Sequence, residues 1–380
     1  MKRKSWCERV TFRGSLAGKG AHIMNVLIVG AGAIGSLIGH RLARVGHEVV
    51  LVGRASYVTA VNERGIGLEE EGEVSWVKRV RAVNSPQVME GSRFDLIIFT
   101  MKAYDTALAA VQTGPLVTDE TPVLVLQNGV GGEEIAGSVL GRGVILSGVI
   151  TLSVEVHEAG LVALRTKRGG LGLASTLRGY GVAWLADAMR EAGFRTEIFP
   201  DYRAMKWSKL LLNMLGNAIP AILDLPPEDV FTSSNLFALE RQALAEALAV
   251  MEASNLEPVN LPGYPVPLFA RALTRGPQFL MHFIFRRMIG GGRGGKPPSL
   301  HLDLLRGRAR SEVEYLNGAV VRAADRLNVP VPVNRVLYEL LMGIVRGEIP
   351  WEVYRRRPDR LWLAVRSGTL ERKVAPECAS

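Results

Sequence analysis

The sequence predicts an α/β protein, with an N-terminal domain built on a parallel sheet and an all-α C-terminal domain. In the first half, short apolar runs alternate with stretches of helical periodicity, the pattern of a parallel sheet covered on both faces. A glycine-rich turn follows the first apolar run, and beyond Pro200 the periodicity is mostly helical. We therefore expect domains at residues 24–200 and 201–348, followed by a C-terminal tail at 349–380.

The expected elements follow from these patterns. Continuous apolar runs predict buried strands at residues 25–29, 48–52, 96–99, 123–126 and 144–146. Apolar residues at helical spacing predict helices at residues 37–45, 181–193, 207–223, 234–256, 311–327 and 334–346. Clustered prolines and glycines predict loops at 258–267 and 290–298.

The charge of the chain is unevenly distributed. Its 380 residues include 46 Lys and Arg against 37 Asp and Glu, a formal charge of +9, which can indicate nucleic acid, an anionic membrane surface or a phosphorylated ligand. Residues 1–23 carry +5 and residues 271–296 carry +6, so the rest of the chain is slightly acidic. Helix-turn-helix and zinc-finger spacings, which would indicate a nucleic-acid-binding protein, are absent from the sequence. We expect a small anionic ligand, and neither nucleic acid nor a membrane as a partner.

The two ends of the chain give simpler indications. Residues 1–23 show neither helical nor strand periodicity, and Met24 directly precedes the first expected strand. We interpret this segment as a disordered leader or as sequence upstream of a start at Met24; a basic arm for an acidic partner is the alternative. Cys7 and Cys378 lie near opposite ends, so they predict neither a disulfide framework nor a metal site. We expect no metal and a cytoplasmic protein.

The turn after the first expected strand has the form G-x-G-x-x-G. In dinucleotide-binding Rossmann-type domains the first glycine makes the turn, the second lets the backbone approach a pyrophosphate, and the third lets helix and strand pack closely. The helix that follows directs its N-terminal N–H groups at the phosphates. The motif stands between an expected strand and an expected helix, as this interpretation requires; an ordinary glycine turn is the alternative. The predicted cofactor-binding residues of the turn are Gly30, Ala31, Gly32, Ala33, Ile34 and Gly35.

The second expected strand leads into Gly53 and Arg54, with no acidic residue. Sites for NAD place Asp or Glu there to bind the ribose hydroxyls, whereas an arginine suits the 2′-phosphate of NADP through charge-assisted hydrogen bonds. We therefore predict NADP(H) as the cofactor and Arg54 as a contact. A surface arginine without this role is the alternative.

Two later loops follow expected strands. Lys102 ends the first, Thr100-Met101-Lys102, and Asn128 lies in the second, which begins at Gln127. Ligands of open α/β sheets bind at the carboxyl ends of the strands, so a lysine for a phosphate and an asparagine for the nicotinamide end fit this position. Either residue could equally have a structural role, because an Asn-Gly turn is a common local device.

The expected helix at 207–223 carries a narrow polar stripe. Lys209, Asn213 and Asn217 recur every four positions and therefore share one face, while the rest of the helix is nearly all apolar. A solvated face is normally wider and carries mixed charges. The stripe favours a helix that faces a polar cleft; a mostly buried helix with a thin wet edge is the alternative.

In their order and spacing, these motifs resemble the ketopantoate reductases (2-dehydropantoate 2-reductases), NADPH enzymes of pantothenate synthesis. The resemblance extends from Met24 to about residue 346. It implies a Rossmann domain joined to a helical domain, with the active site in the cleft between them. The motifs that carry it are the glycine turn, Thr100 to Lys102, Gln127 to Gly131, Trp207 to Asn217, and Ser299 to Asp303 followed by Glu312 to Gly318.

The resemblance also implies roles for single residues. Lys209 matches the general acid of the family, and Glu312 matches the acid that closes on the nicotinamide ribose side. The implied substrate contacts are Asn213, Asn217 and Ser299. The implied cofactor contacts are Arg54, Lys102 and Asn128, beside the glycine turn.

The chain departs from the family pattern in three places. Pro226-Pro227 stands where the family has a further asparagine, one extra residue lies between Gly307 and Glu312, and the basic segment at 258–296 is long. These changes border the expected substrate pocket, so the reaction type follows from the resemblance more directly than the substrate does.

The resulting prediction is an enzyme that reduces 2-dehydropantoate to pantoate with NADPH, with Lys209 as the general acid, and that forms a homodimer. A reductase of a related branched 2-keto acid is the first alternative. A module that senses NADP(H) without turnover is the second, although such a sensor would need no proton donor.

Overall fold

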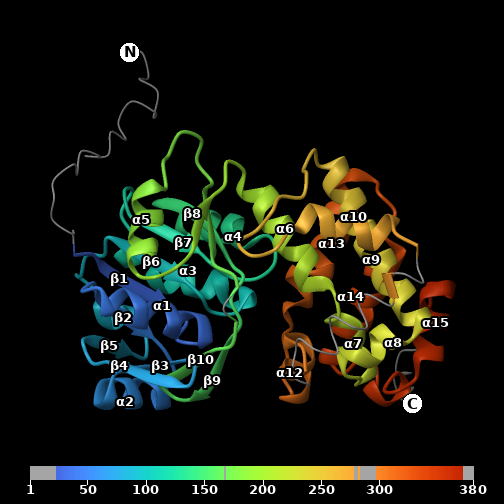
Figure 1. Ribbon diagram of the computed structural model, residues 1–380, viewed down its shortest axis with the longest axis horizontal. Helices are drawn as coiled ribbons and strands as arrows, with labels where there is room; N and C mark the ends of the chain where they lie inside the picture. Colours follow the sequence, from blue (N-terminus) through green and yellow to red (C-terminus); the bar gives the residue numbers. More distant parts are fainter. Residues whose placement is uncertain (1–22, 167, 278–280, 283–296, 371–380) are drawn as a thin grey trace, which may run out of the picture.

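The structure, a computed structural model, describes four stretches of the chain: residues 23–166, 168–277, 281–282 and 297–370. A sheet half and a helical half lie side by side along the long axis of the molecule (Figure 1). The expected leader lies outside the described residues except for Ile23, and so does most of the basic segment at 271–296. Of the expected loop at 290–298, only Pro297 and Pro298 are described.

The sheet half is built on an eight-stranded sheet. In spatial order its strands are β12 (Thr196–Ile198), β11 (Leu171–Ser175), β8 (Val144–Ile150), β7 (Pro122–Val125), β6 (Leu96–Phe99), β1 (Asn25–Val29), β2 (Glu48–Val52) and β5 (Val80–Val83). Strand β11 runs antiparallel to β8, and the other neighbouring pairs are parallel. From β5 to β8 the strands take the order of a doubly wound Rossmann-type sheet. The predicted parallel sheet is therefore confirmed.

Alternation along β1 explains how the sheet is covered. Val26 and Ile28 contribute to one apolar core and Leu27 and Val29 to another, as expected for side chains that point to opposite faces of a strand. Helices α1 (Ala33–Arg44) and α5 (Ala183–Glu191) pack on the first face, and α3 (Thr106–Thr113) and α4 (Gly132–Leu140) on the second. The remaining elements of this half are α2 (Ala55–Arg64) and a small sheet in the order β4 (Glu73–Val77), β3 (Ile66–Glu70), β10 (Leu161–Leu164) and β9 (Val154–Glu158).

The register of the parallel strands aligns their carboxyl ends. Val29 of β1 lies beside Val52 of β2 and Phe99 of β6, and Phe99 lies beside Val125 of β7. The turns that follow these four strands therefore meet at one edge of the sheet. This edge contains the glycine turn, Arg54 and the two loops that the sequence indicated.

The helical half packs around one large apolar core. Its helices are α6 (Tyr202–Met214), α7 (Ala218–Leu223), α8 (Pro227–Thr232), α9 (Ser234–Ala253), α10 (Val266–Arg275), α12 (Ser299–Leu305), α13 (Asn317–Leu327), α14 (Pro332–Val345) and α15 (Pro358–Ser367). Helix α6 lies at the junction of the two halves (Figure 1). Within the described residues, every helix is too short or too polar to cross a membrane.

The segment expected to form a tail after residue 348 belongs to the helical half instead. Ile349, Tyr354 and Leu361 are buried in its core. The Trp351 side chain and the Arg356 backbone N–H donate to the carbonyls that end α7, over 2.8 and 2.7 Å. Aromatic and aliphatic anchors of this kind hold the chain in the fold through α15, so the helical domain extends well beyond the expected boundary.

Two expected helices differ from the structure. The helix expected at 207–223 begins at Tyr202, where Asp201 caps it, and it breaks between Met214 and Ala218. Pro220 does not cause the break, because it lies in the first turn of α7, where its missing N–H needs no partner. The helix expected at 311–327 is divided into a short 3₁₀ turn, Glu312–Tyr315, and α13.

Candidate active site

The glycine turn after β1 has the three-part geometry of a dinucleotide cradle. A Cβ at Gly30, whose φ is +112°, would lie 2.3 Å from the backbone N of Met101 in the loop after β6. A Cβ at Gly35 would lie 2.2 Å from the carbonyl oxygen of Gly30. A Cβ at Gly32 would have no neighbouring atom within 4 Å, so the backbone is open to an approaching phosphate. The turn thus packs tightly where helix and strand meet and stays open where α1 begins, which fits a pyrophosphate.

The end of β2 lies beside this turn. The Gly53 N–H donates to the carbonyl of Val83 over 3.0 Å, and a Cβ at Gly53 would meet Tyr57 and Ala31 within 3 Å. Arg54, the next residue, is exposed at the N-cap position of α2, whose first turn contains no acidic residue. An anionic group placed here would meet a cation and a helix N-terminus without a competing carboxylate.

Lys102, at the end of the loop after β6, forms ion pairs with two acids of the helical half. Its Nζ lies 3.0 Å from Asp303 of α12 and also donates to Glu312 of the 3₁₀ turn. Both carboxylates are buried, whereas the lysine side chain is 30% exposed. Burial alone would lower the pKa of Lys102, but the two carboxylates raise it above its ordinary value. Glu312 therefore faces the edge of the sheet that carries the glycine turn and the loops after β6 and β7, hereafter the cofactor edge. The spacing of the sequence alone does not distinguish Glu312 from Glu314 in this respect.

A second set of contacts crosses beside the first. Arg308 lies 3.4 Å from Asp303 and donates to the Tyr104 hydroxyl over 2.8 Å. Arg310 pairs with Asp105 at 2.8 Å, and its guanidinium lies 4.6 Å from the centre of the Tyr104 ring. The segment that carries the extra residue before Glu312 thus fastens the helical half to the start of α3.

Asn128, in the loop after β7, contacts two elements of the helical half. Its side-chain oxygen accepts a hydrogen bond of 3.0 Å from Asn213 Nδ2 on α6. The next residue, Gly129, has φ +87°, and a Cβ there would lie 2.4 Å from the Tyr315 carbonyl oxygen. Lys209, one turn before Asn213, is half-buried. The structure therefore brings the loop of Asn128 to the helix that carries Lys209 and Asn213.

The break after α6 places Asn217 and Ser299 together. Gly216, with φ +60°, donates its N–H to the Glu240 carboxylate over 3.1 Å. Asn217 then donates to the Asn213 carbonyl over 2.9 Å and accepts from the Leu300 N–H at 3.2 Å. Leu300 is the second residue of α12, which the exposed Ser299 opens. Asn217 thus stabilises the N-terminus of the helix that presents Ser299.

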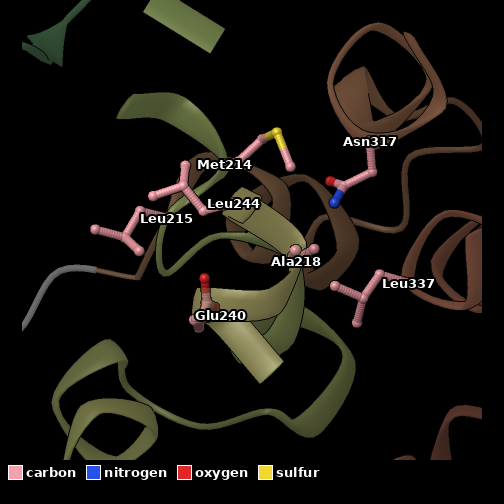
Figure 2. A pocket seen from close by; sticks show the side chains of 8 residues that line it. Met214, Leu215, Ala218, Glu240, Leu244, Asn317 and Leu337 are labelled. Atoms are coloured by element: carbon pink, nitrogen blue, oxygen red, sulfur yellow. The ribbon is translucent and has the colours of Figure 1, made fainter. Parts of the chain in front are cut away.

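A small cavity lies behind this break (Figure 2). Its volume is about 10 Å³, the space of a single water molecule. Met214, Leu215 and Glu240 line one side, and Asn317 of α13 contributes a buried side-chain oxygen that has no hydrogen-bond partner within the described residues. Apolar packing therefore supports the break and leaves a cavity of the size of one water molecule, with a polar side chain in its lining.

Comparisons with known proteins identify the family of the chain. The model of the family "Ketopantoate reductase PanE/ApbA" matches residues 26–175, and the model of the family's C-terminal domain matches residues 201–345. The 2-dehydropantoate 2-reductase of Pyrococcus horikoshii is 30% identical over 319 residues, which are 84% of this chain and 96% of the relative.

The chain belongs to the ketopantoate reductase family. A PanE/ApbA family ketopantoate reductase from Ralstonia eutropha JMP134 is 33% identical, with a TM-score of 0.71 over 85% of this chain and 99% of its own. A D-mandelate dehydrogenase in complex with NADH and anilino(oxo)acetate is 25% identical, with a TM-score of 0.73 over the same shares. The family resemblance and the two-domain fold inferred from the sequence are both confirmed.

The candidate site also contains residues to which the sequence analysis gave no role of their own. Asp303, Arg308 and Glu240 take part through their contacts with predicted residues, and a buried lysine, Lys206, lies one turn before Lys209. Each is a charged residue on a helix or loop whose partner is distant in sequence. Ser311 caps the 3₁₀ turn that contains Glu312, because its hydroxyl accepts from the Val313 N–H at 3.3 Å. Within the described residues, no cluster of His, Cys, Asp and Glu has the arrangement of a metal site.

Proposed function

We propose that this reductase converts 2-dehydropantoate to pantoate with NADPH, the reaction that supplies pantoate for pantothenate and coenzyme A. One observation carries the proposal: Lys102 with Glu312 and Asn128 with Asn213 join the cofactor edge of the sheet to the helix of Lys209. A substrate bound at this junction would meet a dinucleotide on one side and a lysine with amide groups on the other. The names of the family's relatives support the choice of substrate.

In this proposal Lys209 polarises the keto group and donates the proton to the developing alkoxide. Asn213 and Ser299 donate hydrogen bonds that fix the substrate, while Asn217 holds the two elements that carry them. Glu312 contacts the ribose next to the nicotinamide and holds Lys102 beside the cofactor. Bound NADPH would supply the hydride.

The proposed cofactor is NADPH rather than NADH. Exposed Arg54 and the first turn of α2, which lacks acidic residues, suit a 2′-phosphate. The structurally similar D-mandelate dehydrogenase was solved with NADH, so NADH is the alternative cofactor. Steady-state kinetics with both cofactors test the proposal, and equal kcat/KM values for NADPH and NADH would overturn it.

A second candidate is a reductase of another branched 2-keto acid. The D-mandelate dehydrogenase complex holds anilino(oxo)acetate, an aryl-substituted 2-oxo acid, on a closely similar fold. In this chain Pro227 opens α8 where the family pattern has asparagine, so this position has no side-chain amide. A panel of 2-keto acids with NADPH oxidation as the readout separates the candidates. Activity highest on 2-ketopantoate supports the first proposal, and NADPH binding without reduction of any keto acid would favour a sensor.

The assembly is part of the same proposal. We expect a homodimer in the cytoplasm. Light scattering of the purified protein would test the dimer.

A further inference from the structure

Lys206 is a buried cation at the junction of the two halves, and the proposed mechanism does not use it. The whole residue is 3% exposed. The Nζ atom lies 3.1 Å from the Glu133 carboxylate of α4, and both side chains are 3% exposed. Ser147 of β8 donates a further hydrogen bond of 2.6 Å to the same carboxylate. A charge pair that is shielded from water in this way is stable only when its remaining hydrogen-bonding groups have partners. In this structure those groups point at specific partner atoms.

Lys206 also makes a contact with the cofactor edge. Its Nζ donates to the backbone carbonyl of Gln127 over 2.7 Å. Gln127 immediately precedes Asn128, whose side chain meets Asn213 of α6. Two side chains of α6 therefore hold the start of the loop after β7, one through the backbone and one through a side chain.

The Gln127 side chain extends this contact to the loop after β6. Its Nε2 donates to the carbonyls of Met101 and Lys102 over 3.1 and 3.2 Å. Its Oε1 accepts from the Thr106 hydroxyl over 3.0 Å at the start of α3. Met101 is also the residue whose backbone lies against Gly30 in the glycine turn. One glutamine thus ties together the loops after β6 and β7, and its own backbone is held by Lys206.

We propose that Lys206 is a positioning residue: its ammonium fixes the Gln127 carbonyl, and through Gln127 it fixes the cofactor-facing loops relative to the helix that bears Lys209. The inference rests on the proposed function. Glu133 supplies the counter-charge that keeps the ammonium buried. An apolar side chain could fill the same volume, but it would leave the carbonyl without its donor.

The experiment separates positioning from simple stabilisation. The variants are Lys206→Met, Glu133→Gln, and the double variant with both changes. The double variant removes both charges, and the glutamine that it introduces can still accept a hydrogen bond from the Ser147 hydroxyl. Arg203→Met is the matched control, because it removes an exposed cation one turn earlier on α6, whose Nε lies 3.9 Å from Asp201.

Three measurements are made on each variant. Thermal unfolding without cofactor reports stability. Amide hydrogen exchange of residues 100–106 and 127–131, also without cofactor, reports the order of the two loops. NADPH binding by fluorescence, together with kcat and KM, reports the consequence for the site.

We expect Lys206→Met to unfold more easily, since it leaves a buried carboxylate unpaired. The double variant should recover much of the wild-type stability while both loops still exchange faster. A small displacement of cofactor contacts is costly, so in the double variant the KM for NADPH should rise about tenfold while kcat changes less. Arg203→Met should behave as the wild type in all three measurements.

A double variant with wild-type stability, loop exchange and KM would show that the pair only stabilises the fold and would overturn the proposal. Should the double variant not fold, Gln127→Met decides, because it leaves the ion pair intact and removes the link to Met101 and Lys102. Unchanged exchange of residues 100–106 in that variant also overturns the proposal. Failure of the proposed function looks different: the wild type would reduce no 2-keto acid, while loop exchange and NADPH binding would still report on Lys206.

Discussion

Among the electrostatic links that join the halves of this reductase, two differ sharply in their access to water. The pair of Lys206 and Glu133 is dry, with both side chains 3% exposed. The link of Lys102 with Asp303 and Glu312 opens on its lysine side, where 30% of the side chain is exposed. Burial makes a lost partner costly, because the remaining charge cannot recover its hydration. The dry link is therefore suited to hold a fixed geometry, and the open link is suited to exchange partners when a charged ligand arrives.

The largest effect is expected at the dry link. Glu133→Ala leaves the Lys206 ammonium buried without its counter-charge, so the free energy of unfolding should fall by about 3–5 kcal/mol. Urea denaturation followed by circular dichroism measures it. Glu134→Ala, at the neighbouring position that accepts from the Tyr202 hydroxyl, is the control and should change stability far less. Equal losses in the two variants would mean that the burial of the pair of Lys206 and Glu133 adds nothing to the cost of losing a carboxylate.

Two lysines one turn apart on α6 sharpen the comparison. Lys209 is half-buried where Lys206 is fully buried, and its proposed role is to act on substrate. Lys209→Ala should lower kcat by about 10²-fold or more, the usual scale for a general acid. The free energy of unfolding of Lys209→Ala should fall far less than that of Glu133→Ala. The assay is NADPH oxidation at saturating substrate, and near-normal turnover would remove Lys209 from the role.

The same contrast explains what the sequence could and could not predict. Strands β1, β2 and β6 match the expected bounds, because a continuous apolar run that ends at a turn is a local signal. The glycine turn is also a local signal, because its three glycines stand at fixed spacing directly after β1. These features position the cofactor edge, so the family and the fold could be inferred from the sequence.

Contacts between distant segments gave no such signal. The break at Gly216 is held by Glu240, 24 residues away, and nothing in the sequence of α6 indicates that its polar stripe is interrupted. Lys206 resembles an ordinary helical lysine until Glu133 is placed beside it. The anchoring of Tyr354 in the helical core likewise depends on packing that only the fold creates. The roles of Lys209, Asn213 and Ser299 stay predictions that kinetics must decide.

A buried group without a counter-ion provides a third comparison. Burial lowers the pKa of His40 on α1 from 6.5 to about 4, so the imidazole is neutral in the folded protein near pH 7. The unfolded chain binds this proton near pH 6.5, and the folded chain does so only near pH 4. The folded state therefore keeps its full stability above pH 6.5 and loses about 3 kcal/mol of it as the pH falls toward 4.

The test compares the wild type with His40→Gln by denaturant titration at several pH values. A glutamine can keep a hydrogen bond to the Ser75 carbonyl but takes up no proton. The stability difference between the two proteins should shrink as the pH is lowered. A constant difference from pH 7 to pH 4.5 would contradict the assigned shift.

The smallest change in stability is expected at the open link. Lys102→Met removes the cation, yet Arg308 remains beside Asp303 and water can reach the vacated position. The free energy of unfolding should therefore fall by less than in Glu133→Ala, because water and Arg308 compensate part of the lost pairing. The KM for NADPH should rise, because the lysine is a proposed cofactor contact. Lys102→Arg, which keeps the charge, should recover part of the affinity. If Lys102→Met instead destabilised the fold as strongly as Glu133→Ala, both links would be structural, and the difference in access to water would not separate their roles.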